Sequence, residues 1–174
     1  VGITFVLPKL FGGEGEGGLR VVSAEDVGAS LSREELLRLS WDMKIYAVDS
    51  FLHPYVGSVD ILREDGPAQG EEAFRIQHWN REFFRFSGSY GANLMEEVWR
   101  YALVASSVAA REEFDVIHAH DWLTYPAGIE AKRISGRPLV VHVHATEFDR
   151  SGENVNQLVY DIERAGMEAA DRVI

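Results

Sequence analysis

Two pairs of histidines close two apolar runs in the second half of the chain. His118 and His120 end the run FDVIHAH, and His142 and His144 end the run PLVVHVH. Side chains two apart on a strand share a face, so each pair is expected to present two imidazoles on one side of a sheet. An imidazole can bind a metal ion, carry a proton or hydrogen-bond a polar ligand. These four of the six histidines therefore mark a candidate site.

Three interpretations of the histidine pairs stay open on the residues alone. A zinc-type metal site is chemically sensible, because imidazoles and carboxylates at strand ends bind such ions, and it needs a third convergent ligand. In the second interpretation His118 and His142, which stand among Val and Ile, are core residues, and only the outer histidines face a cleft. We favour the third, a metal-free polar substrate site, because convergent polar groups at such strand ends usually bind a ligand.

Carboxylates and other polar side chains follow both runs. Asp121 comes directly after the first run, Glu147 comes shortly after the second, and residues 146–154 alternate carboxylates with one arginine and hydroxyl or amide groups. That composition suits a polyhydroxylated ligand, which is held by many directional hydrogen bonds. The alternative is a solvated loop in which Ser151 or Asn154 caps the next helix.

Aromatic residues stand both within an expected helix and at the end of an expected strand. Trp99 and Tyr101 fall in a long expected helix, where packing is the better interpretation. Trp122 follows Asp121 at a strand end, so it either forms a wall against a sugar ring or packs under the helix that starts at Pro126.

Apolar periodicity predicts the elements that must position these residues. Strands are expected over residues 1–7, 19–22, 45–48, 59–62, 114–119 and 139–144, with another begun at 173–174. Helices are expected after Ser32, with Glu35 completing a capping box, and over residues 93–113, 126–133 and about 154–170. Residues 65–72 read as a polar loop. This alternation predicts a doubly wound α/β fold with a mostly parallel sheet covered on both faces. Ligands then lie beyond the carboxyl ends of the strands.

The segment GGEGEGG, residues 12–18, contains the pattern G-x-G-x-x-G after the first expected strand. A dinucleotide site also needs a helix whose N-terminus meets the pyrophosphate, whereas a second strand is expected here. Glu14 and Glu16 would in addition repel the phosphates. We therefore expect a flexible surface loop and no dinucleotide site.

The composition bounds the class of protein. The 174 residues suit one domain, and 17 Lys and Arg against 28 Asp and Glu give a net charge of -11, which disfavours nucleic acid and anionic lipid as partners. Cys is absent, which excludes a thiol nucleophile, a zinc–thiolate site and disulfides. No apolar run approaches the roughly 20 residues of a membrane span, so we expect a cytoplasmic protein. Both ends fall inside expected strands, so we expect a piece of a larger protein.

Several of these motifs together resemble one known family. The run FDVIHAHDWLT, residues 114–124, followed by Ala127 and Gly128, resembles the amino-terminal domain of the glycogen/starch synthase-like, group-1 glycosyltransferases. The run PLVVHVHATE, residues 138–147, falls where that family has its V-H-N or V-H-x strand end, and residues 169–174 resemble the approach to the next strand. The resemblance covers about residues 90–174; residues 4–10 add a likeness to the family's second strand.

The resemblance implies one half of a two-domain GT-B architecture. Residues 1–174 would be the Rossmann-like acceptor domain, without its first strand and without the carboxy-terminal domain that binds most of the nucleotide-sugar donor. The implied reaction is the retaining transfer of a hexose, with glucose the first expectation, to a sugar or glucan acceptor, with no metal or other cofactor. The piece alone is expected to be inactive, because neither domain alone closes the site. The acidic charge suits the half that faces sugar hydroxyls, with the phosphate-binding charges elsewhere.

By the same resemblance, Asp121 would lie in the interdomain cleft near the acceptor and the transferred sugar, and His144 would lie against the donor sugar near its anomeric carbon. Ala145 stands where the synthases have Asn. Further substrate contacts are predicted at the polar and aromatic residues around the two strand ends, namely His120, Trp122, Thr124, Glu147, Asp149 and Arg150. The alternatives are a metal-dependent hydrolase that uses His118, His120 and either His142 or His144, and a non-catalytic carbohydrate-binding module.

Overall fold

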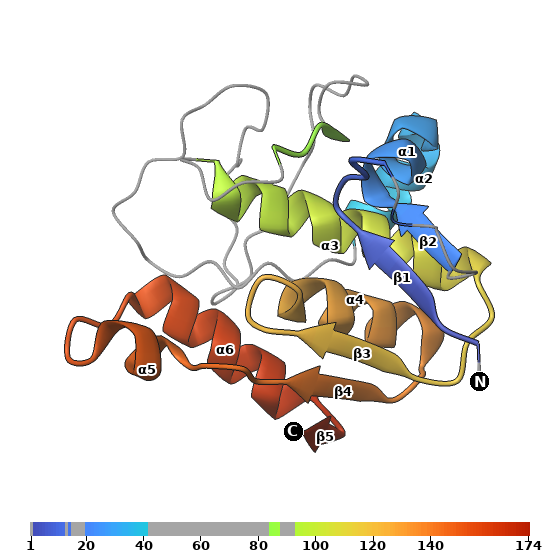
Figure 1. The fold of residues 1–174 in the computed structure, drawn as a ribbon. Helices are drawn as coiled ribbons and strands as arrows, with labels where there is room; N and C mark the ends of the chain where they lie inside the picture. Colours follow the sequence, from blue (N-terminus) through green and yellow to red (C-terminus); the bar gives the residue numbers. More distant parts are fainter. Residues whose placement is uncertain (1, 13, 15–19, 42–83, 88–92) are drawn as a thin grey trace, which may run out of the picture.

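The computed structural model describes residues 2–12, 14, 20–41, 84–87 and 93–174 (Figure 1). The strands expected over residues 45–48 and 59–62, the polar loop at 65–72 and most of the glycine-rich segment lie outside the described residues. The described part alternates strands with helices and contains two parallel sheets, one of two strands and one of three. The expected α/β class with parallel strands is confirmed.

The three-stranded sheet carries the histidines. Its strands, in spatial order and all parallel, are β3 (Ile117–His120), β4 (Leu139–His142) and β5 (Arg172–Val173). The crossover from β3 to β4 is α4 (Tyr125–Ser135), and the crossover from β4 to β5 contains α6 (Gln157–Ala169). Both helices lie on the same side of the sheet, behind the strands in the view of Figure 1. The expected strand at the end of the chain is therefore present as β5.

One face of this sheet is apolar because alternate residues of β3 and β4 are apolar. Ala119, Leu139 and Val141 are buried, and they pack with Tyr125 of α4 and Ile162 of α6. Burying an aliphatic side chain of this kind stabilises the fold by about 1.5–3 kcal/mol. The alternation that fills this core places the intervening histidines on the opposite face.

The long expected helix is α3 (Leu94–Arg111), which packs against α4. Its buried residues form a second core with α1 (Ala24–Ser30) and α2 (Arg33–Trp41). Tyr101 is buried in this core, and its hydroxyl donates a hydrogen bond of 2.7 Å to the carbonyl oxygen of Val6. Packing, the interpretation favoured for Tyr101 in the sequence, is confirmed.

The smaller sheet pairs β1 (Thr4–Leu7) with β2 (Arg20–Ser23), and α1 follows β2 directly. The sequence did not lead us to α1, although Ser23 caps it by accepting the backbone N–H of Asp26. The capping box of α2 is confirmed, because Ser32 and Glu35 each accept the other's backbone N–H.

The ends of several expected elements were wrong by one to three residues. The first strand begins at Thr4, the strand expected over 114–119 covers 117–120, and the strand expected over 139–144 ends at His142. The last helix begins at Gln157, capped by Asn156 and not by Ser151 or Asn154. The Asn156 side chain accepts the backbone N–H groups of Leu158 and Val159, which is why the helix starts there.

Candidate functional site

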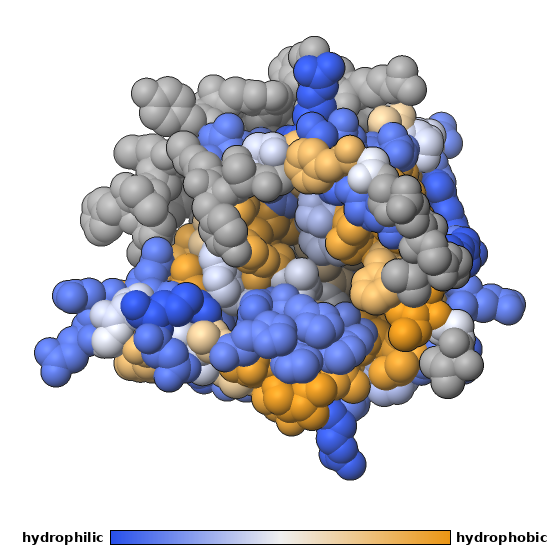
Figure 2. All heavy atoms as spheres, in the orientation of Figure 1, coloured by the Kyte–Doolittle hydropathy of each residue, from blue (hydrophilic) through white to orange (hydrophobic). Residues whose placement is uncertain are grey.

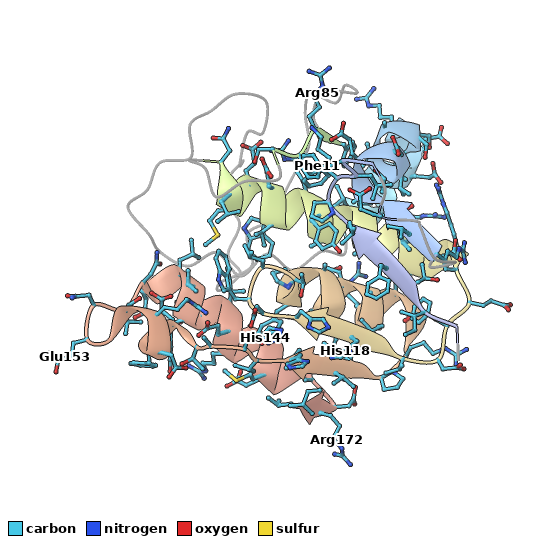
Figure 3. The ribbon with its side chains drawn as sticks, viewed as in Figure 1. Phe11, Arg85, His118, His144, Glu153 and Arg172 are labelled. Atoms are coloured by element: carbon cyan, nitrogen blue, oxygen red, sulfur yellow. The ribbon has the colours of Figure 1, made fainter. Side chains whose placement is uncertain are left out.

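The four histidines form a ladder across the tips of β3 and β4. His120 stands opposite His142 in the register of the two strands. The ring centroids of His118 and His120 lie 4.3 Å apart, as do those of His142 and His144, and those of His120 and His142 lie 4.9 Å apart. In Figure 3 the labelled His118 and His144 lie on the face of the sheet turned to the viewer, away from α4 and α6. We call these four residues the histidine ladder.

The ladder is open to solvent on its outer side. His118, His120 and His144 are exposed and His142 is half-buried. Figure 2 shows a hydrophilic patch over β3 and β4, next to a hollow in the surface. The interpretation of His118 as a buried core residue is therefore wrong, because the apolar neighbours Ile117 and Ala119 turn to the other face.

His120 has a pKa that is shifted by partial burial and by the other three histidines of the ladder. Its Nδ1 lies 3.3 Å from Nε2 of His144, so one of these two nitrogens donates a hydrogen bond to the other. Partial burial lowers the pKa of His120, and the neighbouring His118, His142 and His144 lower it further, because a charge on one ring disfavours a charge on the next. His120 is therefore neutral near pH 7, with one donor and one acceptor nitrogen.

Asp121 joins the tips of the two strands. Its backbone N–H donates to the carbonyl oxygen of His142 at 2.9 Å, and its Oδ1 accepts the backbone N–H of His144 at 2.9 Å. Asp121 has a φ of 58°, a left-handed conformation that costs a non-glycine residue about 1–2 kcal/mol. Backbone strain of this kind gathers at functional sites, because the surrounding contacts hold a side chain where the chemistry needs it.

The residues after Asp121 hold the same turn. The Thr124 hydroxyl donates to the carbonyl oxygen of His120 at 2.7 Å, which fixes the turn between β3 and α4. Trp122 is half-buried and packs against the core that contains Tyr125. The structure thus uses Thr124 and Trp122 to shape the turn, and their substrate contacts stay predictions.

The polar segment after β4 is partly helical. Residues 147–151 form the short helix α5 (Glu147–Ser151) within what was expected to be a loop. Thr146 and Asp149 make its capping box: Asp149 Oδ2 accepts the Thr146 backbone N–H at 2.8 Å and the Thr146 hydroxyl at 2.7 Å. These hydrogen bonds lower the pKa of the Asp149 carboxyl. The Asp149 carboxylate is therefore engaged in the cap, and a sugar contact there stays a prediction.

Glu147 and Arg150 belong to a network with Glu163 of α6. The Arg150 guanidinium contacts Glu163 Oε1 at 2.5 Å and Glu147 Oε2 at 3.3 Å, and both carboxylates are buried. Glu147 also accepts the Ser151 hydroxyl and the backbone N–H of Asn156, and these bonds together with Arg150 lower its pKa. Glu163 was not predicted from the sequence, although a glutamate beside Ile162 on the apolar side of a helix is a signal for a buried ion pair.

The network also holds the segment that follows His144. Arg150 Nη1 donates to the carbonyl oxygen of Ala145 at 2.5 Å, and the backbone N–H of Glu147 donates to Glu163 Oε2 at 2.8 Å. The side chains predicted to contact substrate at Glu147 and Arg150 thus point to each other and to Glu163, and their substrate contacts stay predictions.

Replacing Arg150 by methionine is expected to lower the free energy of unfolding by about 2 kcal/mol, because two buried carboxylates lose their shared cation. Chemical denaturation followed by circular dichroism measures this change. The matched control is Arg164→Met, which breaks the ion pair between Arg164 and Glu168. The Arg164 side chain is 59% exposed and the Glu168 side chain is 64% exposed. This control is expected to change stability by less than about 0.5 kcal/mol. Equal losses in the two variants would contradict a special role for the network.

Three of the ladder residues lie close enough together to be candidate metal ligands. The ligand nitrogens of His118, His120 and His142 all lie within 4.8 Å of one another. His142 Nδ1 is buried and, within the described residues, has no hydrogen-bond partner.

In the part of the chain that the structure describes, no helix is long and apolar enough to cross a membrane.

Fold and site together define a class of protein. A parallel α/β sheet with polar groups gathered beyond the carboxyl ends of its strands is typical of a Rossmann-like domain. Residues 28–174, most of the chain, match the family model of the glycosyl transferase 4-like domain. The chain therefore belongs to this family, and the expected kinship with the amino-terminal domains of group-1 glycosyltransferases is confirmed.

A curated relative points the same way over a short stretch. The chain is 44% identical over 41 residues to a protein of Methanocaldococcus jannaschii named an uncharacterised glycosyltransferase. The match covers 24% of this chain and 10% of the relative, so it spans about a tenth of that protein's length. The comparison with solved structures gave no match.

Proposed function

We propose that the chain is the acceptor-side domain of a retaining glycosyltransferase. The reaction moves a hexose, with glucose the first candidate, from a nucleoside-diphosphate sugar to a sugar or glucan acceptor. The domain, residues 1–174, is incomplete, and a carboxy-terminal domain binds most of the donor. The observation that carries the proposal is the hydrogen bond that joins Asp121 to His144 at adjacent strand tips within a glycosyltransferase-family domain.

The reaction breaks the bond between the anomeric carbon and the phosphate oxygen and forms one from that carbon to an acceptor oxygen. The acceptor hydroxyl proton leaves with the diphosphate or with a base. Positive charge develops on the sugar ring, and nearby carboxylate and carbonyl oxygens stabilise it. Asp121 supplies such an oxygen. Its side chain is half-exposed, and among the described residues the His144 N–H bonds only Oδ1, so Oδ2 is available to the sugar.

His144 has the second role in this proposal. Its ring is exposed at the tip of the ladder, and its Nε2 faces His120 Nδ1. Because its backbone is held by Asp121, the ring is fixed where it can hydrogen-bond a hydroxyl of the transferred sugar. Such orientation lowers the barrier by removing the freedom of the reacting groups in advance. His120 is then a positioning residue for the His144 ring.

The charge of the chain supports this division between domains. The net charge of -11 suits contact with sugar hydroxyls, whereas a diphosphate needs cations. We propose that the phosphate-binding cations belong to the other domain, that transfer needs no metal or other cofactor, and that the protein works in the cytoplasm.

The test is turnover by the full-length protein with UDP-glucose or ADP-glucose and a glucan acceptor, measured as release of nucleoside diphosphate. His144→Ala is expected to lower kcat by about 100-fold, because an oriented contact to the reacting sugar is lost. The control Arg137→Ala changes an exposed residue in the turn before β4 and is expected to keep full activity. Undiminished turnover in His144→Ala would contradict the proposal, as would turnover by residues 1–174 alone. Sugar binding without turnover in the full-length protein would favour a carbohydrate-binding module.

A further inference from the structure

The inner part of the histidine ladder has a geometry that glycosyl transfer does not explain. The proposed transfer uses the outer tip of the ladder, at His144 and Asp121. His118 lies further from this tip, two residues before His120 along β3. Nitrogens of His118, His120 and His142 nevertheless converge within 4.8 Å of one another. A tetrahedral ion about 2.0–2.1 Å from each nitrogen would hold them about 3.4 Å apart. The rings have to turn for their nitrogens to reach that spacing, and His118 and His120 are exposed, which leaves them room to turn.

The paired strands place these three rings next to one another, so only the rings, and not the backbone, have to turn for their nitrogens to converge. His118 and His120 share a face because they are two apart on one strand, and His142 stands opposite His120 in the parallel register. The ring planes of His118 and His142 differ by 10°, with centroids 5.6 Å apart. The site is thus built on two paired strands, which hold ligands more rigidly than loops do.

A second observation points to a missing ligand. Within the described residues, His142 Nδ1 is the buried side-chain nitrogen or oxygen that has no hydrogen-bond partner. Leaving such a group unpaired costs about 1–3 kcal/mol, so buried polar atoms nearly always have a partner. A cation that accepts a lone pair from the imidazole would supply one.

The donor set selects the kind of ion. All three donors are imidazole nitrogens, and such sites favour zinc, copper, nickel and iron over the oxygen-seeking magnesium and calcium ions. Three histidines with a fourth position open to water is a known zinc arrangement.

We propose that His118, His120 and His142 bind one divalent transition-metal ion of the zinc and copper class. The ion competes with the contact of 3.3 Å between His120 and His144, because His120 turns toward the metal. Occupation therefore inhibits sugar transfer, a consequence that rests on the proposed function. The binding itself does not depend on that function.

The binding test is titration of the full-length protein with Zn²⁺ against a chromogenic chelator. One ion per chain is expected, and Co²⁺ in its place is expected to give the visible absorption of a four-coordinate ion. His118→Ala and His142→Ala are each expected to weaken binding by at least about 10-fold. The matched control is His144→Ala, which removes a ladder histidine outside the trio and is expected to change the affinity by less than about threefold. The thermal unfolding midpoint without metal shows whether each variant is folded.

The inhibition test uses the same proteins. Zn²⁺ is expected to lower transfer by the wild type, EDTA to restore it, and His118→Ala to resist the inhibition. Unchanged Zn²⁺ binding in folded His118→Ala and His142→Ala would overturn the site. Binding at the trio without any effect on transfer would overturn the inhibitory consequence. Absence of sugar transfer in the metal-free wild type counts against the proposed function alone, because the chelator titration still decides whether the metal site exists.

Discussion

Asp121→Ala in the full-length protein is expected to lower kcat by about 100-fold or more, with a smaller change in KM. The substitution removes the acceptor of the His144 N–H bond, so the tips of β3 and β4 lose the link that fixes the His144 ring. A displacement of about 1 Å in a catalytic group can cost a factor of about 100 in rate. The substitution also removes the carboxylate proposed to stabilise the charge that develops on the sugar. Steady-state release of nucleoside diphosphate measures the effect.

Two further substitutions separate the roles of Asp121. Asp121→Asn keeps an oxygen for the His144 N–H and tolerates the left-handed backbone, so it is expected to lose the charge and keep the geometry. Asp121→Gly relieves the strain at φ 58° and is expected to fold well, while it loses both the charge and the bond to the His144 N–H.

The control is Asp115→Asn, which changes an exposed aspartate before β3 and is expected to keep full activity. An unchanged kcat in Asp121→Ala would remove Asp121 from the mechanism.

Gly166→Val is expected to destabilise the protein by about 3 kcal/mol. A Cβ at position 166 would lie 2.6 Å from Cγ and 2.7 Å from Cβ of Tyr125, closer than carbon atoms pack. Tyr125 has little room to give, since it is 1% exposed and its hydroxyl donates to the carbonyl oxygen of His142 at 3.2 Å. Overpacking a filled core costs about 1–3 kcal/mol and sometimes more. Chemical denaturation measures the loss.

The control for this substitution is Glu168→Val, at an exposed position of the same helix. It places valine in the same helix without the clash, and it costs less than about 1 kcal/mol in helix propensity and in the exposed pair with Arg164. Similar stabilities of the two variants would show that α6 and α4 do not approach each other as closely as Gly166 and Tyr125 indicate.

The elements around the site could be predicted because local rules determine them. Alternating apolar residues locate β3 and β4, and the H-x-H spacing alone puts His118 with His120 and His142 with His144 on shared faces. Adjacent parallel strands end at the same edge, so the meeting of Asp121 and His144 follows from the topology.

The remaining features depend on contacts between distant residues. The register that sets His120 opposite His142 is a property of strand pairing, and no local signal contains it. The short helix α5 is held by a capping box and by Glu163, which lies in the next helix, 13 residues after Arg150. The position of Trp122 depends on the core beneath it, so sequence alone left its two interpretations open.

The most direct test of the central claim is a crystal structure of the full-length protein with an unreactive nucleoside-diphosphate sugar and an acceptor. The account predicts that the transferred sugar lies beyond the tips of β3 and β4, with its hydroxyls in hydrogen-bonding contact with His144 and the acceptor beside Asp121. A sugar bound elsewhere, with neither residue in contact with donor or acceptor, would contradict it.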